Sequence, residues 1–305
     1  MKSDEGEGGA GQDGGPFLVS VIIPTYDRPE LLRRSLGSVI GQTYRRLEII
    51  VVDDASSVDV APIIGSFHDD RIRLIRHDVR QGAPIARNDG IAIAKGSYIA
   101  FQDDDDEWFP EKVAAQMDDL ATKGWRYKVS YCLGETRNDA KGTTTIHSKN
   151  GWDGDHLEQL IAGEIRPCGI CFLIARECLQ EVGGYRTDLK RMQDRELWIR
   201  LAEHYQFAFL NRVLARIHVG HGPRISDDFQ DRMDAQSTIY QVHKDLFWRH
   251  RKALSKYLLN YGFELLDGGR KGESRIQFIK AAIANPFRYE PYFGLVMSVR
   301  KKARV

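Results

Sequence analysis

Short apolar runs alternate with segments of helical periodicity from residue 17 onward. The apolar runs have the length and character of buried strands, and lie at 18–23, 47–52, 71–75 and 97–101. Two intervening segments, 29–40 and 84–95, place apolar residues at helical spacing; the first begins at Pro29 and the second stops before Gly96. This alternation predicts an α/β fold with a mostly parallel, doubly wound sheet.

The second half of the chain has a more mixed pattern. It predicts strands at 127–133, 171–174, 207–210 and 213–217, and a helix at 193–204. After about Ser226 the strand signals stop, and helices are predicted at 227–250, 251–266, 273–285 and 290–302. We therefore expect a disordered tail at 1–16, an α/β domain at 17–225 and a C-terminal helical extension at 226–305.

Polar residues follow three of the predicted parallel strands at the point where each strand ends. They occur after Pro24, at Asp53 and Asp54, and in the run Asp103 to Asp106. In open α/β sheets the carboxyl edge of the strands is where ligands bind. The pattern therefore predicts one ligand site built from all three clusters.

Four consecutive aspartates, Asp103 to Asp106, repel one another and should be destabilising without a counter-charge. Hard oxygen ligands suit Mg²⁺ or Mn²⁺, so one interpretation is a divalent cation that carries a phosphorylated ligand. The other is a solvated acidic loop that caps a helix starting near Pro110. The run alone does not separate these two interpretations.

Composition narrows the class of protein. The 305 residues contain 44 Lys and Arg against 43 Asp and Glu, so no bulk charge favours nucleic acid. Cys168 and Cys171 have the spacing of a zinc half-site or a redox pair, but no second pair accompanies them, which favours free buried thiols. No run approaches the ~18 apolar residues needed to span a bilayer, and the first sixteen residues lack an apolar signal segment. A cytoplasmic protein is expected.

Five segments occur in an order that gives the chain a family resemblance. They are Val19-Ser-Val-Ile-Ile-Pro-Thr-Tyr-Asp-Arg28, Glu48-Ile-Ile-Val-Val-Asp-Asp54, Ala86-Arg-Asn-Asp-Gly90, Tyr98-Ile-Ala-Phe-Gln-Asp-Asp-Asp-Asp-Glu-Trp108 and Gln193-Asp-Arg-Glu-Leu-Trp-Ile-Arg-Leu201. Together they resemble family 2 glycosyltransferases of the GT-A fold, which are inverting enzymes that use nucleotide sugars. The resemblance covers about residues 17–220.

The resemblance implies a nucleotide site at the strand ends. Pro24, Thr25 and Tyr26 would touch the nucleotide base, and Asp54 would accept a hydrogen bond from the base or ribose; a helix cap or turn is the alternative for Asp53 and Asp54. Arg87 would neutralise a phosphate, with a surface salt bridge as its alternative.

Within the acidic run, the resemblance implies a metal and ribose site. Asp105 would be the direct metal ligand, and Asp103 and Asp104 would share the ribose and the water shell of the metal. Mn²⁺ or Mg²⁺ would offset the charge that develops on the departing nucleoside diphosphate. Asp106 is expected to cap the following helix.

The resemblance also assigns a general base, Asp194. Gln193 departs from the Glu-Asp pair of the family, yet Asp194 shares a helix face with Leu197 and Leu201, whereas Glu196 points away and is expected to pair with Arg200. A first-turn acid without a catalytic role is the alternative for Asp194.

Two further features carry open alternatives. His221 would be a third metal contact or, more simply, a loop histidine. The C-terminal segment combines aromatic and aliphatic residues from Phe287 to Val299 with basic residues from Arg300 to Arg304. That combination suits either a helix lying on the inner face of an anionic membrane or an ordinary packing helix.

The predicted function is an inverting glycosyltransferase that moves a sugar from a nucleotide-diphospho-sugar, a UDP-sugar being favoured, to an acceptor hydroxyl. The acceptor would be a glycan or a lipid-linked molecule in cell-surface polysaccharide or glycolipid synthesis. One alternative is a non-catalytic nucleotide-binding scaffold of the same fold. The other is a sugar nucleotidyltransferase, which usually carries a Gly-rich first loop that Pro24 to Asp27 do not provide.

Overall fold

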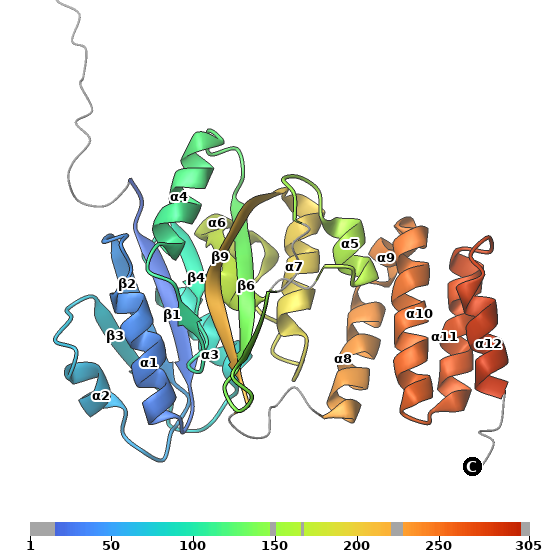
Figure 1. The fold of residues 1–305 in the computed structure, drawn as a ribbon, viewed down its shortest axis with the longest axis horizontal. Helices are drawn as coiled ribbons and strands as arrows, with labels where there is room; N and C mark the ends of the chain where they lie inside the picture. Colours follow the sequence, from blue (N-terminus) through green and yellow to red (C-terminus); the bar gives the residue numbers. More distant parts are fainter. Residues whose placement is uncertain (1–15, 147–150, 166–167, 221–227, 300–305) are drawn as a thin grey trace, which may run out of the picture.

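A computed structural model describes residues 16–146, 151–165, 168–220 and 228–299. Residues 1–15 of the predicted tail, His221 and the basic residues 300–304 lie outside the described residues, as does the predicted boundary at 225. Figure 1 shows an elongated molecule with the sheet in one part and a group of helices at the other end.

Four parallel strands form the first part of the sheet, and they match the predicted apolar runs. They are β1 (Val19–Thr25), β2 (Leu47–Asp53), β3 (Ile72–Arg76) and β4 (Tyr98–Phe101), in the spatial order β3-β2-β1-β4. Every residue of β1 and β2 is buried, because helices cover both faces of a parallel sheet. β1 continues through Pro24, beyond Ile22, where its pairing with Phe101 of β4 ends. The proline therefore interrupts no pairing on that side.

The second half adds antiparallel pairs to the sheet. Its strands are β5 (Glu107–Trp108), β6 (Val129–Asn138), β7 (Thr143–Ile146), β8 (Phe172–Ala175) and β9 (Phe207–Val219). Within the described residues the order continues from β4 as β8-β6-β9-β5, with β7 on the side of β6. β6 and β9 are parallel, and the other pairs in this half are antiparallel. The α/β fold class is confirmed, and the parallel character belongs mainly to its first half.

Helices cover the sheet and fix the strand ends. They are α1 (Pro29–Ile40), α2 (Ala61–Gly65), α3 (Ala83–Ile93), α4 (Lys112–Thr122), α5 (Leu157–Ala162), the short 3₁₀ turn η1 (Gly169–Cys171), α6 (Arg176–Val182) and α7 (Gln193–His204). Gly90 shows how closely α3 approaches the sheet, because a Cβ atom there would lie 2.5 Å from Ile22. Trp108 and Trp198 are both buried, as core residues would be.

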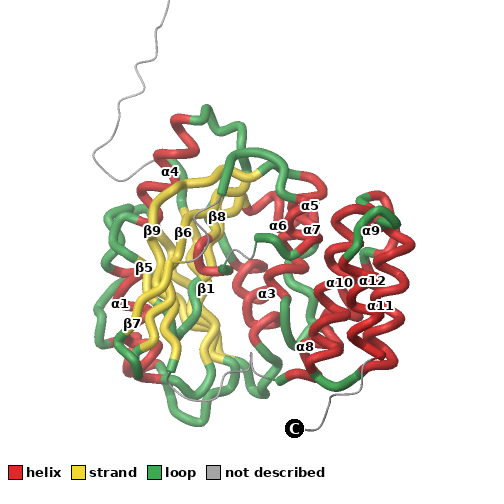
Figure 2. Tube along the Cα trace, turned by 45° about the vertical axis from the view of Figure 1, so that its right-hand side comes forward, coloured by secondary structure: helices red, strands yellow, loops and turns green. Residues whose placement is uncertain are grey.

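The C-terminal extension is helical, as predicted. Its helices are α8 (Phe229–Val242), α9 (Lys244–Arg249), α10 (Arg251–Asp267), α11 (Lys271–Ala284) and α12 (Glu290–Val299). The last three pack around the ring of Phe278, which is fully buried, and the glycines Gly262 and Gly294 leave room for that ring. Figures 1 and 2 show α11 and α12 far from the parallel strands. In the described parts of the chain, no helix has the length and apolar character that crossing a bilayer requires.

Candidate active site

The three strand-end clusters meet at one edge of the sheet. Thr25 at the end of β1 donates a hydrogen bond from its Oγ1 to Asp104 Oδ2, which is 2.8 Å away. Thr25 also pairs with Asp53 in the sheet register, so the end of β2 lies beside it. Parallel neighbours thus bring together residues that are far apart in sequence.

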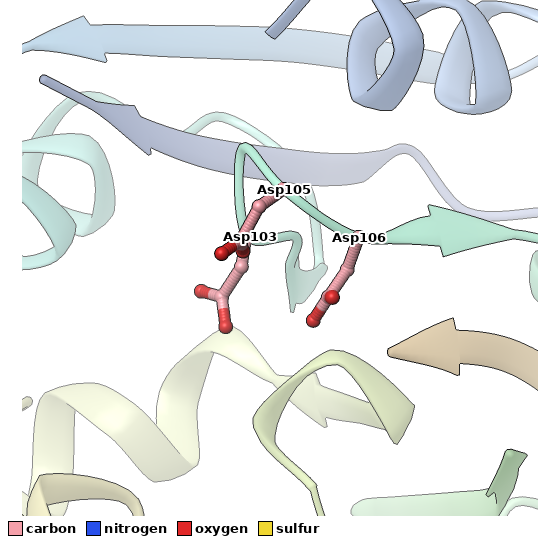
Figure 3. A group of neighbouring side chains, drawn as sticks. All are labelled: Asp103, Asp105 and Asp106. Atoms are coloured by element: carbon pink, nitrogen blue, oxygen red, sulfur yellow. The ribbon is translucent and has the colours of Figure 1, made fainter. Parts of the chain in front are cut away.

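Three carboxylates of the acidic run converge. Oxygen atoms of Asp103, Asp105 and Asp106 all lie within 4.8 Å of one another, and Figure 3 shows these side chains extending from the turn after β4. Asp103 and Asp105 are the two residues predicted as metal ligands. Such a set of hard oxygen donors fits Mg²⁺ or Mn²⁺.

Arg28, which immediately precedes α1, lies against the acidic run. Its Nη1 is 3.1 Å from Asp104 Oδ1 and 3.1 Å from Asp105 Oδ2. Burial raises the pKa of Asp104 to about 6; Asp105 adds to that shift, and Arg28 opposes it. The sequence did not predict this role for Arg28, because its contact with the acidic run is visible only in the structure.

Arg87 on α3 forms a second ion pair with the run. Its Nη2 lies 2.7 Å from Asp103 Oδ1, and only 9% of its side chain is exposed. The salt bridge considered as the alternative is present, with Arg87 largely buried and the Asp103 side chain 34% exposed, and the contact of Arg87 with a phosphate stays a prediction. Burial lowers the pKa of Arg87, but Asp103 and Asp194 help to raise it well above its usual value, so the guanidinium stays charged.

Asp194 lies in the first turn of α7, on the side of Arg87 and Asp103. Its Oδ1 atom is enclosed and has no hydrogen-bond partner within the described residues. Gly169 makes room for the carboxylate, since a Cβ atom there would lie 2.9 Å from Asp194 Oδ2. Burial raises the pKa of Asp194 above the usual range; Arg87 and the nearby hydroxyl of Tyr185 lower it, and Asp103 raises it. A partly buried carboxylate with one enclosed, unpaired oxygen and a raised pKa has the properties of a proton acceptor.

Asp54 organises a loop at the same edge. Its two oxygens accept hydrogen bonds from the backbone amides of Gln81 at 2.8 Å and Gly82 at 2.7 Å, and His77 Nδ1 lies 2.8 Å from Oδ1. Burial raises the pKa of Asp54, but these donors outweigh it and lower the pKa overall. Asp54 thus has partners within the chain that its sequence position did not reveal.

The same loop reaches Tyr26. The guanidinium of Arg80 lies 4.0 Å from the centre of the Tyr26 ring, so a cation stacks on an aromatic side chain of the predicted nucleotide site. Arg80 was missed in the sequence analysis, although its place just before α3 could have drawn attention to it.

Asp106 does not cap the next helix, so that prediction is wrong. α4 begins at Lys112, after Glu111, and makes no side-chain cap hydrogen bond. Asp106 is instead buried, and its Oδ1 accepts the backbone amide of His218 at 2.9 Å, because β5 pairs with β9 and brings the two together. His218 in turn lies 2.6 Å from Glu107 and 2.8 Å from Asp139.

Two smaller predictions have clear outcomes. Cys168 and Cys171 are free; Cys171 is buried and Cys168 partly so. Among the described residues, the only group of His, Cys, Asp or Glu side chains with metal-site spacing is the aspartate set. Glu196 pairs with Arg200 at 2.7 Å, as predicted, and is also 3.0 Å from His243.

Several known proteins are similar to this chain in sequence or in fold. The Escherichia coli K12 protein WcaA, provisionally named a colanic acid biosynthesis glycosyl transferase, is 28% identical over 251 residues, which cover 79% of this chain and 87% of WcaA. An Escherichia coli protein named UDP-Glc:alpha-D-GlcNAc-diphosphoundecaprenol beta-1,3-glucosyltransferase WfaP is 41% identical over 106 residues. That match covers 35% of this chain and 42% of WfaP, so it spans less than half of either protein.

Solved structures support the fold. A crystal structure of S. aureus TarS 1-349 superposes with a TM-score of 0.69 at 13% identity, covering 92% of this chain and 88% of TarS 1-349. The complex of TarS 1-349 with UDP-GlcNAc gives a TM-score of 0.64 at 14% identity, covering 91% and 89%. At these identities the likeness concerns the fold, which is the predicted GT-A fold.

A match to a protein-family sequence profile over most of the sheet domain shows the family of the chain. The sequence profile of glycosyl transferase family 2 matches residues 20–183, more than half of the chain. This range includes the strand-end clusters and the acidic run, and it stops before α7. The chain belongs to glycosyl transferase family 2.

Proposed function

We propose that the chain is an inverting glycosyltransferase that takes its sugar from a UDP-sugar. Membership in family 2 supports sugar transfer, the name of WfaP specifies a UDP-linked sugar, and TarS 1-349 forms a complex with another, UDP-GlcNAc. In this proposal Pro24, Thr25, Tyr26, Asp54 and Asp104 surround the nucleotide, and Arg87 lies near its diphosphate. The name of WfaP also contains a lipid-linked acceptor, diphosphoundecaprenol. We extend that acceptor class to this chain, which would place it at the inner face of the membrane in cell-surface polysaccharide or glycolipid synthesis.

A divalent metal fits the carboxylates that converge after β4. Asp103 and Asp105 would hold Mn²⁺ or Mg²⁺, and Asp106 joins them within the same 4.8 Å group. When bound, the ion would supply positive charge that stabilises the nucleoside diphosphate as it leaves.

The observation that carries the proposal is the unpaired, enclosed Oδ1 of Asp194 beside the Arg87–Asp103 ion pair. In the proposed step, Asp194 accepts the proton of the acceptor hydroxyl as its oxygen attacks the anomeric carbon of the sugar. The bond from that carbon to the diphosphate breaks on the opposite side, so the anomeric configuration inverts. Arg87 holds Asp103 in place through their ion pair while charge develops on the diphosphate.

Replacing Asp194 with asparagine tests this role, because the change removes the proton acceptor and keeps the shape. We expect Asp194→Asn to bind UDP with Mn²⁺ as the wild type does, and to lose about 10²-fold to 10⁴-fold in transfer rate. Asp188→Asn is the matched control, since Asp188 is an exposed aspartate that pairs with Arg186. In the wild type, the acid limb of kcat/KM should lie above pH ~4, because burial raises the pKa of Asp194.

Two results would separate this proposal from its alternatives. Transfer at the wild-type rate by Asp194→Asn would remove Asp194 from the reaction. UDP binding by the wild type without transfer to any lipid-linked or glycan acceptor would favour a nucleotide-binding scaffold.

A further inference from the structure

Exposed apolar side chains gather at the far end of the helical extension. Of the fifteen large hydrophobic residues that are exposed in the described chain, ten lie between Ile276 and Val299, on α11, α12 and the turn that joins them. Phe287 in that turn is fully exposed, and Tyr289 is 76% exposed. We call the exposed apolar residues between 276 and 299 the outer face. Exposed apolar surface concentrated in this way marks an interaction site.

The residues of the outer face lie on the sides of α11 and α12 that do not pack against the rest of the molecule. On α11, Ile276, Ile279 and Ile283 recur at helical spacing and are each about half exposed, whereas Phe278 on the opposite side is fully buried. On α12, Val296 is 54% exposed, and Gly294 on the opposite side packs against Phe278. Both helices therefore already bury one side against the molecule, and their other side has no cover within the described chain.

The charge of the outer face indicates which partner covers it. Among the exposed residues from 274 to 299, Arg275 is the only one that is not apolar, aromatic or proline. The single acid in this range, Glu290, is held by Arg288 at 2.9 Å. In the sequence, α12 is followed by Arg300, Lys301, Lys302 and Arg304. The region thus combines apolar and aromatic surface with positive charge and no free acid.

The first fifteen residues are a poor candidate for the cover. Met1 is the one large apolar residue among residues 1–15, which are otherwise rich in Gly, Asp and Glu. A second copy would bring the same positive charge and no acid on its own outer face to balance it. Lipid headgroups supply negative charge, and the interface between headgroups and acyl chains suits tyrosine, phenylalanine and aliphatic side chains.

We propose that the outer face binds the surface of a membrane that contains anionic lipid. α11 and α12 would lie on the bilayer with their exposed residues in the headgroup region, and no helix would cross it. Figure 1 shows these helices at the opposite end of the molecule from β1 to β3, so a bound membrane leaves the donor site open. This inference does not depend on the proposed reaction.

Vesicle sedimentation of the full chain tests the inference. Vesicles of phosphatidylcholine with about one third phosphatidylglycerol should pellet the wild type, and vesicles of phosphatidylcholine alone should pellet much less of it. Val296→Glu should lower the vesicle partition coefficient about tenfold, because it places a carboxylate on the outer face. Val242→Glu is the matched control, since Val242 is a helical valine, 44% exposed, at the end of α8 and outside the outer face. It should bind vesicles as the wild type does.

Circular dichroism melting and UDP titration of each variant should show that folding and donor binding are unchanged. Loss of vesicle binding can then be distinguished from loss of UDP binding. Wild-type protein that stays in the supernatant with anionic vesicles would overturn the inference. Equal sedimentation of Val296→Glu and wild type would also overturn it. A wild-type dimer in light scattering that Val296→Glu dissociates, without vesicle binding, would instead assign the outer face to a second copy.

Discussion

The four aspartates after β4 are neutralised in part by the chain itself. Arg28 contacts Asp104 and Asp105, and Arg87 contacts Asp103, so two guanidinium groups lie among the carboxylates. The sequence predicts that such a run needs a counter-charge, and a divalent cation was the counter-charge considered. The structure shows that two arginines supply part of this positive charge. Four carboxylates against two guanidinium groups leave net negative charge, so a metal ion could still bind at Asp103, Asp105 and Asp106.

Replacing Arg28 should expose this repulsion. Without metal, Arg28→Gln should lower the free energy of unfolding by about 1 kcal/mol, because Asp104 and Asp105 lose a shared, partly exposed cation. Added Mn²⁺ should restore most of that loss. Thermal unfolding with EDTA and with Mn²⁺ measures both effects. Arg33→Gln on the neighbouring helix α1 is the control, because Arg33 donates a hydrogen bond to Ser66 on the surface. If Arg28→Gln is as stable as the wild type in EDTA, Arg28 is not the counter-ion.

Single residues also mark the limit of what the sequence predicts. Asp103 and Asp105 lie close together, as their position after one strand predicts, and their role as metal ligands stays a prediction. Asp106 was misassigned, since its partner is the amide of His218, more than a hundred positions away. The hydrogen bonds from the backbone amides of Gln81 and Gly82 to Asp54 could not be predicted. They depend on the tertiary structure, which brings residues 81 and 82 next to the end of β2.

At the scale of elements, the buried carboxylate of Glu196 joins α7 to the helical extension. Glu196 on α7 is fully buried and contacts Arg200 and His243, the residue that follows α8. Burial raises the pKa of Glu196, but its hydrogen bonds to His243 and Arg200 lower the pKa more, so the ionised form is favoured in the folded protein. A lowered folded-state pKa contributes stability above the unfolded pKa of about 4.5, and that contribution is lost as the pH falls through the folded pKa.

Glu196→Gln should therefore destabilise the protein in a pH-dependent way. We expect a loss of about 3 kcal/mol in the free energy of unfolding at pH ~7, because Arg200 loses its buried carboxylate partner. The difference between wild type and variant should shrink below pH ~4.5. Urea unfolding at the two pH values gives the comparison. Glu203 is also on α7, and Glu203→Gln removes a partly exposed pair with Arg249 of α9, so it should cost less than about 1 kcal/mol. A difference for Glu196→Gln that is independent of pH would contradict this account.

Elements were predicted best where local pattern determines them. The strands β1 to β4 and the helices α1 and α3 appear close to their predicted bounds, because buried parallel strands need continuous apolar runs. β9 was predicted as two strands, divided at Asn211 and Arg212. The structure has one strand, in which these residues bulge where Leu210 pairs with Cys132 and Val213 with Leu133. The pairing of β5 with β9 could not be predicted either, because it joins distant segments of the chain.

At the scale of the whole molecule, the sheet gathers the candidate donor site at one edge and the helical extension carries the outer face at the far end (Figure 1). The alternation of strands and helices predicted this division of the fold, and the ordered family motifs predicted the site. Neither pattern predicted the exposure of α11 and α12, because exposure depends on how the three last helices pack around Phe278.

Calorimetric titration of UDP tests the central claim most directly, with Mn²⁺ or EDTA present, on the wild type and on Asp105→Asn. The account predicts that Mn²⁺ tightens UDP binding by the wild type at least about tenfold, because the aspartates hold an ion that contacts the diphosphate. In Asp105→Asn that gain should disappear while the folded protein persists. Equal UDP affinity with Mn²⁺ and with EDTA in the wild type, or no UDP binding at all, would contradict the account.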